Sequence, residues 1–332
     1  MKPEDHLIAA DGPIRLGVSS CLLGARVRFD GGHKRSRFLV DTLGRFVEFV
    51  PVCPEVEIGL GVPRETLRLV RRGGEGRMVA NETGIDHTQK MNAYADRRVA
   101  ALGHEKLCGY VLKNNSASCG MEQVRVYRAC GSPARPGPGL FAAALMRRYP
   151  NLPVEEEERL RDPRLRENFI ERIFAYHRLR SFFSPRWTLD GLARFHAAHR
   201  LALMAHSPQA WAKLGRIVAN AKRMRRDRVA AGYEHEFMRA LKRPATRAGH
   251  GRVLRHMLSR LRPRLDPKTR ADLAATVEDY SRGLVPLAKA IARFRRCARR
   301  FGIGYLRAQV YLEPGPVERM LRSRAGRGFD PV

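Results

Sequence analysis

Acidic side chains, cysteine and long apolar runs are all scarce in this chain of 332 residues. No stretch approaches the roughly 20 uninterrupted apolar residues of a membrane-spanning helix, so no membrane association is expected. Residues 1–5 include acids and no apolar core, which is not typical of a secretory signal and predicts a cytoplasmic location. Six cysteines are too few and too scattered for a disulfide scaffold, which leaves metal binding, catalysis or packing.

The shortage of acids makes the chain strongly basic, with 63 Lys+Arg against 33 Asp+Glu and a net charge of +30. From Arg186 to the end there are 33 basic and 11 acidic residues, a net charge of +22, and the preceding 185 residues have a net charge of only +8. A genomic bias toward arginine should raise the positive charge of both halves of the chain alike. The asymmetry therefore predicts a polyanion-binding second half, because the arginine fork suits phosphate.

Short apolar runs alternate with segments of helical period as far as about Tyr149. This pattern predicts an α/β domain with a parallel, Rossmann-like sheet. The expected strands are residues 16–20, 47–52, 68–70, 78–80, 110–112 and 124–127. The expected helices are residues 86–107, 139–149 and 164–183, a loop is expected at 133–138, and 151–163 is a charged segment with prolines near both ends.

The second half has long helical patterns and is expected to be an all-α domain, so we predict domains at residues 1–180 and 181–332. Asp266-Pro267 is a typical helix start, with an N-cap carboxylate and proline in the first turn. The expected helices are residues 188–206, 208–232, 233–242, 249–262 and 267–301, and a strand pattern appears at 305–312.

Three cysteines, Cys21, Cys53 and Cys119, each follow a predicted strand. Ligands of open α/β sheets bind beyond the carboxyl ends of the strands, so these thiols are candidates for one site. A zinc site would need a fourth ligand, and the C-x2-C spacing typical of zinc does not occur. An iron–sulfur cluster or simple burial are the other interpretations. The other three cysteines are expected to be packing residues: Cys108, Cys130 and Cys297.

Groups that can move protons lie close to these cysteines in the sequence: Glu55, Ser116 and Asp30. A carboxylate can act as a general base on water, and a hydroxyl can bond to a developing anion. Each of these residues can also be an ordinary turn or cap residue, and Asp30-Gly31 is a common turn dipeptide.

Four separate motifs occur in order along the first half, and together they resemble the thiouracil desulfidase family. They are SSCLLG (19–24), VRFDGG (27–32), PVCPE (51–55) and SASCG (116–120), and the likeness extends over roughly residues 14–178. The second half is similar to an uncharacterised helical domain, through FHAAHR (195–200) and QVYLEP (309–314). The two-part arrangement resembles bacterial desulfidases that convert 4-thiouridine in tRNA to uridine.

This resemblance implies a [4Fe–4S] cluster held by Cys21, Cys53 and Cys119, with one open iron that acts as a Lewis acid on the substrate sulfur. It also implies catalytic roles for Glu55 and Ser116, and Asp30 could compete with Glu55 as the base. The reaction would be a hydrolytic, non-redox C–S cleavage that releases hydrosulfide. One departure is Ala117, where the family usually has proline.

The basic second half is expected to bind RNA, because Lys and Arg contacts to phosphate supply most nonspecific nucleic-acid affinity. The expected contacts are Arg216, Lys222, Arg223, Arg225, Arg226, Arg293, Arg296 and Arg300. His196 and His199, spaced i and i+3, could hold a metal, contact phosphate or pack in the core. Trp187 and Trp211 are core residues or base-stacking residues.

The predicted function is thus desulfidation of 4-thiouridine in tRNA, with tRNA as the partner and no obligate protein partner. A second interpretation keeps the chemistry and takes free thiouracil or thionucleotides as the substrate. A third is a non-enzymatic RNA-binding protein with structural cysteines.

Overall fold

The computed structural model describes residues 12–325 except 73, 74 and 129, so residues 1–5 lie outside the described part. The chain divides into two compact units, Gly12–Phe169 and a unit that begins at Ile170. The division falls inside helix α4 (Pro163–Phe182).

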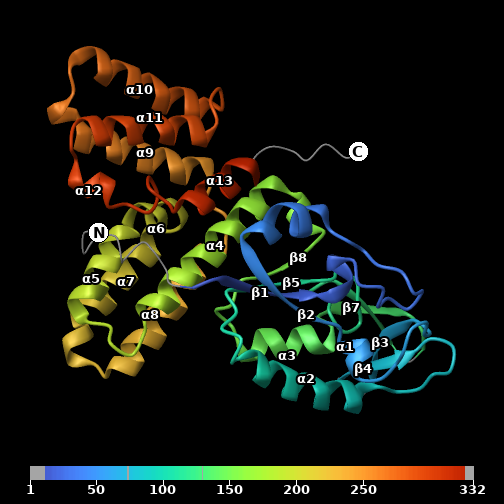
Figure 1. Ribbon diagram of the computed structural model, residues 1–332. Helices are drawn as coiled ribbons and strands as arrows, with labels where there is room; N and C mark the ends of the chain where they lie inside the picture. Colours follow the sequence, from blue (N-terminus) through green and yellow to red (C-terminus); the bar gives the residue numbers. More distant parts are fainter. Residues whose placement is uncertain (1–11, 73–74, 129, 326–332) are drawn as a thin grey trace. The chain divides into compact units, whose positions relative to one another are not determined.

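The first unit is built around a parallel four-stranded sheet with the order β2-β1-β5-β8, which confirms the α/β fold class with a parallel sheet (Figure 1). Its strands are β1 (Ile14–Ser19), β2 (Val47–Val52), β5 (Gly109–Leu112) and β8 (Val154–Glu156). All four residues of β5 are buried, as is typical of a parallel strand covered on both faces.

Two helices, α2 (Thr88–Leu102) and α3 (Leu140–Arg148), pack against this sheet through an aromatic cluster. The Tyr110 ring of β5 contacts Phe141 of α3, and Phe141 contacts Tyr94 of α2. Gly17 of β1 makes room for this cluster, because a Cβ at that position would lie 2.1 Å from the Tyr110 ring. The position therefore requires glycine for packing and not for its backbone angles.

The register of the parallel sheet determines where the functional segments lie. Ser19 of β1 is paired with Val52 of β2, and Val18 is paired with Val111 of β5. Three neighbouring strands therefore end at the same edge of the sheet. The segments that follow them bear Cys21, Cys53 and Cys119.

A second sheet, with the order β4-β3-β6-β7, corrects the expectation of a single sheet in this unit. Its strands are β3 (Leu67–Arg72), β4 (Glu75–Ala80), β6 (Val124–Arg128) and β7 (Pro133–Gly137). The β3–β6 pair is parallel, and the β3–β4 and β6–β7 pairs are antiparallel.

Two strands lie outside the predicted set: β7 replaces the loop predicted at 133–138, so that prediction was wrong, and β8 lies in the charged segment 151–163. Strand β7 contains two prolines but lies at the edge of its sheet, where a missing N–H is tolerated. Strand β8 contains Glu155 and Glu156, both buried, and Glu156 accepts a hydrogen bond from the Met121 N–H. Short helical turns complete the unit: η2 (Ser20–Leu23), η3 (Phe38–Thr42), η4 (Leu43–Arg45), α1 (Pro54–Glu57) and η5 (Arg159–Arg161).

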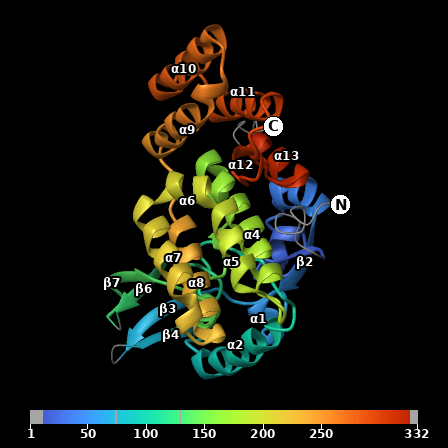
Figure 2. The same ribbon diagram turned by 90° about the vertical axis from the view of Figure 1, so that its left-hand side faces the viewer.

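The second unit is mostly helical, as predicted, and its α8 and α11 lie at opposite ends of the unit in both ribbon views (Figures 1 and 2). The elements after α4 are α5 (Leu189–Ala198), α6 (Arg200–His206), α7 (Pro208–Asn220), η6 (Ala221–Arg223), α8 (Arg226–Leu241), α9 (Arg247–Leu261), η7 (Arg262–Arg264), α10 (Pro267–Arg282), α11 (Leu287–Arg300), α12 (Gly304–Arg307) and α13 (Pro316–Ala325). Within the described residues, no helix combines the length and apolar character needed to cross a membrane.

Several predicted helices were too long. The segment 267–301 is two helices, because Gly283 adopts a left-handed φ of 85° and the Leu284 N–H bonds back to the Asp279 carbonyl. The segment 188–206 is divided at His199, and the helix expected to begin at residue 233 begins instead at Arg226. The strand expected at 305–312 is instead α12 and a turn.

His196 and His199 both lie inside the second unit. His199 is 2 % exposed and bonds through Nδ1 to the Phe195 carbonyl, and His196 bonds to the Tyr233 hydroxyl and stacks on Trp211. Trp187 is buried among aromatic rings and Trp211 is half-buried. The packing interpretation therefore describes both histidines.

We expect this unit to lose stability in mild acid. Burial and the charge of Arg200 lower the pKa of His196 to about 4, burial and Arg178 lower the pKa of His199 to about 3, and burial lowers the pKa of His250 to about 4. The unfolded chain takes up these protons first, since its histidine pKa is about 6.5. The stabilisation that each buried, neutral histidine contributes is thus complete above about pH 6.5. It decreases as the pH falls toward 4, by at most roughly 3 kcal/mol per histidine.

Tryptophan fluorescence can follow this loss, because both tryptophans of the chain belong to the second unit. The melting temperature should fall between about pH 7 and pH 4, and His250→Gln should reduce the size of the fall. The matched control is His104→Gln, an exposed histidine of the first unit. A melting temperature independent of pH over this range would contradict the prediction.

Candidate active site

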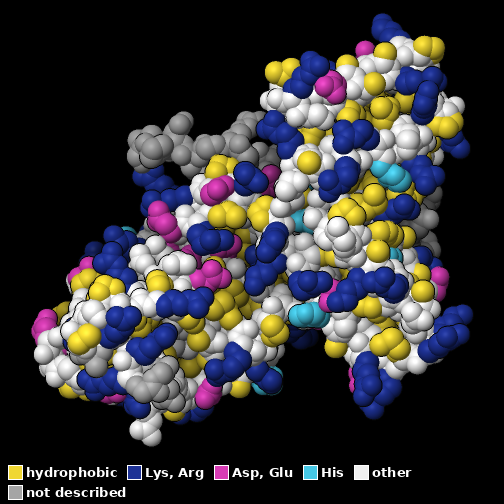
Figure 3. Space-filling view, turned by 180° about the vertical axis from the view of Figure 1, so that it is seen from behind, with side chains coloured by type: hydrophobic (Ala, Val, Ile, Leu, Met, Phe, Trp, Pro, Cys, Tyr) yellow, Lys and Arg dark blue, Asp and Glu magenta, His cyan; other side chains and the backbone are white. Residues whose placement is uncertain are grey.

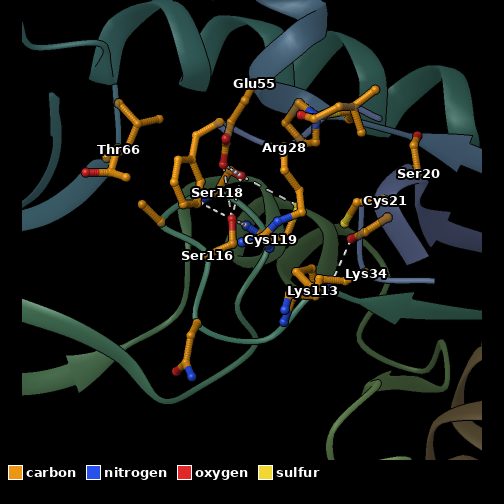
Figure 4. Close-up of a pocket in the computed structure, with 18 of the residues that line it drawn as sticks. Ser20, Cys21, Arg28, Lys34, Glu55, Thr66, Lys113, Ser116, Ser118 and Cys119 are labelled. Atoms are coloured by element: carbon orange, nitrogen blue, oxygen red, sulfur yellow. Dashed lines mark hydrogen bonds between the residues drawn. The ribbon is translucent and has the colours of Figure 1, made fainter. Parts of the chain in front are cut away.

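A cavity of about 380 Å³ lies beyond the carboxyl edge of the parallel sheet in the first unit (Figure 4). Cys21, Cys53 and Cys119 all line it, and so do Glu55 and Ser116. The structure thus brings together five residues that the sequence separates by up to 98 positions, from Cys21 to Cys119. The remaining cysteines lie elsewhere: Cys108 is buried before β5, Cys130 is exposed, and Cys297 is in α11. The exposed Cys130 corrects the expectation that it packs in a core.

Each of the three thiols has its own local support. Cys21 lies in the η2 turn directly after β1, and its carbonyl accepts a hydrogen bond from the Lys34 N–H. Cys53 is the N-cap of α1, and its N–H donates to Glu57 Oε1 at 3.0 Å. The Cys119 N–H donates to Ser116 Oγ at 3.1 Å.

The loop that bears Cys119 is fixed by the start of helix α3. The Leu140 N–H donates to the Ala117 carbonyl and the Ala142 N–H donates to the Ser118 carbonyl, both at 3.1 Å. Gly139 permits this contact, because a Cβ there would lie 2.6 Å from the Ser118 carbonyl group. The loop with Ala117 in place of proline is thus held by backbone hydrogen bonds to α3.

Burial and nearby negative charge raise the pKa of all three thiols. Burial, followed by the charge of Cys53, raises the pKa of the Cys21 thiol to about 11, and burial followed by Glu55 raises the pKa of Cys119 to about 12. Burial also raises the pKa of Cys53. Cys53 contributes to the shift of Cys21, and Cys21 contributes to the shift of Cys119, so each of these two pairs of thiols lies within electrostatic range. Across the described residues, no three His, Cys, Asp or Glu side chains are arranged to hold a single metal ion.

Glu55 is the centre of a hydrogen-bond network at the side of Cys119. Its Oε1 accepts hydrogen bonds from Ser118 Oγ at 2.7 Å and from Ser116 Oγ at 3.1 Å (Figure 4). The two hydroxyls lie 2.9 Å apart, and Ser118 Oγ lies 3.6 Å from the Cys119 sulfur. A proton can therefore pass between the cavity and the carboxylate through either hydroxyl.

The second oxygen of Glu55 is held by Arg64. Arg64 donates to Oε2 from Nη2 at 2.5 Å and from Nε at 3.1 Å. The same guanidinium donates to the carbonyls of Gly61 and Val27, and only 6 % of its side chain is exposed. Arg64 therefore fixes the orientation of the carboxylate and compensates its charge.

Besides Arg64, three basic side chains line the cavity, Arg28, Lys34 and Lys113, against one further carboxylate, Glu65. Lys113 is anchored by an ion pair with Glu157 at 2.5 Å, and its backbone N–H donates to Ser19 Oγ. Arg28 and Lys113 both act to lower the pKa of Cys21, against the larger effect of burial. An anionic group in this cavity would thus be stabilised.

The structure does not place Asp30 among the residues that line the cavity. Its Oδ1 accepts a hydrogen bond from the Gly32 N–H at 2.9 Å, and this bond lowers the pKa of the exposed carboxyl. Asp30 therefore has the geometry of a turn residue. Sequence reasoning assigned no role to Arg64 or Ser118, although Ser118 directly precedes Cys119 and was visible as a second hydroxyl in the same motif.

The residues expected to contact RNA are all exposed on the second unit. Arg216 is in α7, and Lys222, Arg223, Arg225 and Arg226 extend from η6 to the start of α8. Arg293, Arg296 and Arg300 lie on α11, where Arg293 donates to the Thr276 hydroxyl. Lys and Arg side chains are spread widely over the face shown in Figure 3.

Comparison with known proteins assigns the first unit to a family. The family model described as 2-thiouracil desulfurase matches residues 16–157. The uncharacterized protein YbbK of Bacillus subtilis (strain 168) is 35% identical over 113 residues, which cover 31% of this chain and 71% of YbbK. The chain belongs to the 2-thiouracil desulfurase family. The desulfurase match includes all three cavity cysteines, Glu55 and Ser116.

Behind the desulfurase region, residues 200–316 match the model described as protein of unknown function DUF1722. The uncharacterized protein YbgA of Escherichia coli (strain K12) is 30% identical over 154 residues, which cover 46% of this chain and 91% of YbgA. Among solved structures, a protein named [4Fe-4S]-dependent thiouracil desulfidase TudS is 32% identical and has a TM-score of 0.37. That likeness covers 44% of this chain and 93% of the TudS chain.

Proposed function

We propose that this protein is a [4Fe–4S]-dependent desulfidase that converts 4-thiouridine in tRNA to uridine and releases hydrosulfide. The observation that carries the proposal is the meeting of three thiols, from the ends of three adjacent parallel strands, in one cavity with a carboxylate and two hydroxyls. The family of the first unit supplies the class of chemistry, which is removal of sulfur from a thiolated pyrimidine.

The donor set fits an iron–sulfur cluster with one iron not bound by the protein. Thiolate is the usual ligand of such clusters, and a complete protein set would have four. Cys21, Cys53 and Cys119 would hold the cluster, and the remaining lining residues in the described part include no fourth cysteine. When bound, the cluster would supply a Lewis acid for the soft sulfur of the substrate.

The side chains beside the cluster position would accept the proton of the attacking water and transfer it to Glu55. Water adds to the carbon that bears sulfur, a new C–O bond forms, and the C–S bond breaks with the electron pair on sulfur. Ser116 or Ser118 can accept the water proton while donating its own to Glu55 Oε1, because both hydroxyls already bond to that oxygen. The second water proton leaves on the sulfur, as hydrosulfide. Carbon and sulfur keep their oxidation states, so the reaction is hydrolytic and needs no redox step. Arg64 keeps the carboxylate oriented throughout.

The excess of basic residues after Arg186 favours an RNA substrate over a small molecule. A base in folded RNA is stacked, and its removal from the stack costs a few kcal/mol. Phosphate contacts fix the register of an RNA and can offset this cost. A free base would have no use for a net charge of +22 in the second half of the chain.

One observation favours a second candidate, a desulfidase of free thiouracil or thionucleotides. The cavity volume of about 380 Å³ is within the range of small-molecule sites, and it is sufficient for a pyrimidine ring. The two candidates share the same cavity residues and differ only in what is attached to the base.

The deciding experiment compares substrates with protein reconstituted with iron and sulfide under anaerobic conditions. Thiolated tRNA should lose its thiouridine absorbance and release one equivalent of hydrosulfide, faster than free 4-thiouracil or the nucleoside at equal concentration. Faster turnover of the free base would favour the second candidate. A protein that binds zinc and no cluster, and has no activity on any thiolated pyrimidine, would indicate the non-enzymatic interpretation.

The RNA part of the proposal predicts a salt effect for Lys222 and Arg223. Both are exposed and form no ion pair in the described part of the chain. Lys222→Gln/Arg223→Gln should lower the slope of log K for tRNA against log salt by about one to two, since each phosphate contact contributes about 0.7 to 0.9. Titrations of labelled tRNA at several salt concentrations measure this slope.

The matched control is Arg194→Gln/Arg282→Gln, which removes the same charge from arginines already paired with Asp190 and Glu278. It should leave the slope nearly unchanged. Equal slopes for the two double variants would contradict the prediction, because the salt dependence would then reflect the net charge of the chain and not phosphate contacts by Lys222 and Arg223.

A further inference from the structure

A second cavity, of about 650 Å³, adjoins the cysteine cavity within the first unit. The two share Leu67, Asn115 and Ala117 on their walls. The second cavity lies at the starts of β3 and β6, where Arg68 and Arg125 line it. A group bound among the cysteines could therefore continue into this cavity.

The two arginines are neighbours on adjacent strands. Leu69 is paired with Val126 in the parallel register. Arg68 and Arg125 directly precede this pair, so they lie beside each other on the two strands. Both are exposed, and in the described part of the chain neither makes an ion pair or a side-chain hydrogen bond. Like charges side by side on a sheet repel each other, and no carboxylate lines this cavity to compensate them.

This arrangement differs from that of other arginines in the same unit. Arg77 on β4 is paired with Asp86, and Arg15 on β1 is paired with Glu105. Two adjacent and uncompensated guanidinium groups form a site for an anion with several oxygens, because each planar fork donates two parallel hydrogen bonds. Phosphate is such an anion.

Asn115 and Tyr127 add a hydrogen-bonding amide and an aromatic ring, two groups that can bind a nucleoside. Asn115 connects the two cavities and has a left-handed φ of 54°, a conformation of limited cost for asparagine that recurs at functional loops. Tyr127, half-buried, lies two residues after Arg125 and thus on the same side of β6. An amide can bond to a sugar or base edge, and an aromatic ring can stack on a base.

We infer that this second cavity binds a phosphate of the substrate, covalently linked to the thiolated nucleoside whose base enters the cysteine cavity. Arg68 and Arg125 bind the phosphate oxygens, and Tyr127 contacts the adjoining sugar or base. The inference rests on the proposed function, and it extends substrate recognition to the second sheet. The phosphate belongs either to the RNA chain or to a mononucleotide.

The test compares Arg68→Gln/Arg125→Gln with Arg71→Gln/Arg128→Gln. Arg71 and Arg128 are paired in register on the same two strands, are exposed, and lie outside the cavity lining. The period-two alternation of strands directs them to the opposite side from Arg68 and Arg125. The two double variants therefore remove the same charge from opposite sides of the sheet.

For the first variant, kcat/KM for thiolated tRNA should fall about tenfold or more, and that for the unphosphorylated nucleoside should not change. An equal fall for 4-thiouridine monophosphate identifies a monoester site, and a fall for RNA alone identifies a phosphodiester of the chain. The control variant should behave as wild type. Equal losses in both variants, a loss with the nucleoside, or no loss with either phosphorylated substrate would overturn the inference.

A binding measurement separates this inference from the proposed function. Fluorescence anisotropy with a labelled, unthiolated RNA oligonucleotide requires no turnover, so it is informative even if the wild type desulfidates nothing. Weaker binding by Arg68→Gln/Arg125→Gln than by Arg71→Gln/Arg128→Gln supports the phosphate site. Identical affinities of the two variants, both for this oligonucleotide and for a labelled uridine monophosphate, reject it.

Discussion

Cys119→Ala is expected to abolish both cluster binding and desulfidation. With this thiol removed, the described lining of the cavity retains two cysteines, Cys21 and Cys53, and two thiolates are half the usual ligand set of a [4Fe–4S] cluster. Iron and acid-labile sulfide per chain should fall from about four of each to near zero after anaerobic reconstitution, and the visible absorption of the cluster should disappear. Desulfidation should fall to the background rate.

The chain provides matched controls for this loss. Cys130→Ala removes an exposed thiol of the same unit, and Cys297→Ala removes a thiol from α11. Both variants should retain full cluster content and activity. Cys119 is 5 % exposed and its loop packs on α3, so the melting temperature of Cys119→Ala is needed to separate loss of the ligand from loss of the fold. A folded Cys119→Ala protein with a complete cluster would contradict the proposal.

The parallel sheet and the position of the cysteines were predictable because both follow from local pattern. An apolar run that ends in small and polar residues indicates a buried strand and the loop after it, and this pattern occurs before Cys21, Cys53 and Cys119. Parallel strands present their carboxyl ends at one edge, so three such loops meet. The structure has these strands in adjacent positions, in the order β2-β1-β5.

The second sheet and the Arg64 contact were not predictable in the same way. Strand β7 contains two prolines and is strand-forming only through its pairing with β6. Arg64 is nine residues from Glu55 and reaches it because the intervening loop turns back past Val27. Both features depend on tertiary contacts that local propensity does not contain.

In the helical unit, too, some features were predictable from the sequence and others were not. The break at Gly283 had a signal in the sequence, since glycine is the usual residue at a left-handed helix end. The break at His199 had none, because no glycine or proline is present in 195–200. There, Gln309 bonds to the Leu201 N–H and to the Ala197 carbonyl, so a distant side chain supports the interruption. The RNA contacts of this unit stay a prediction.

Glu55→Gln is expected to lower kcat by about 10²- to 10⁴-fold without loss of the cluster. The amide keeps the size of the side chain and can still accept hydrogen bonds from Ser116 and Ser118, but it cannot take up the proton of the attacking water. KM should change little, because the substitution leaves the cavity walls in place. Single-turnover rates at saturating substrate, with cluster content measured on the same sample, test this expectation.

Three further variants show whether the effect belongs to Glu55 itself. Glu48→Gln removes an exposed carboxylate from β2, the strand that leads to Cys53, and should leave kcat unchanged. Arg64→Gln should lower kcat less than Glu55→Gln does, because it releases the carboxylate from its fixed orientation without removing the base. Arg64→Lys should restore part of the rate, since lysine keeps the charge and loses the fork. Full activity in Glu55→Gln with an intact cluster would assign the proton to another group in the cavity.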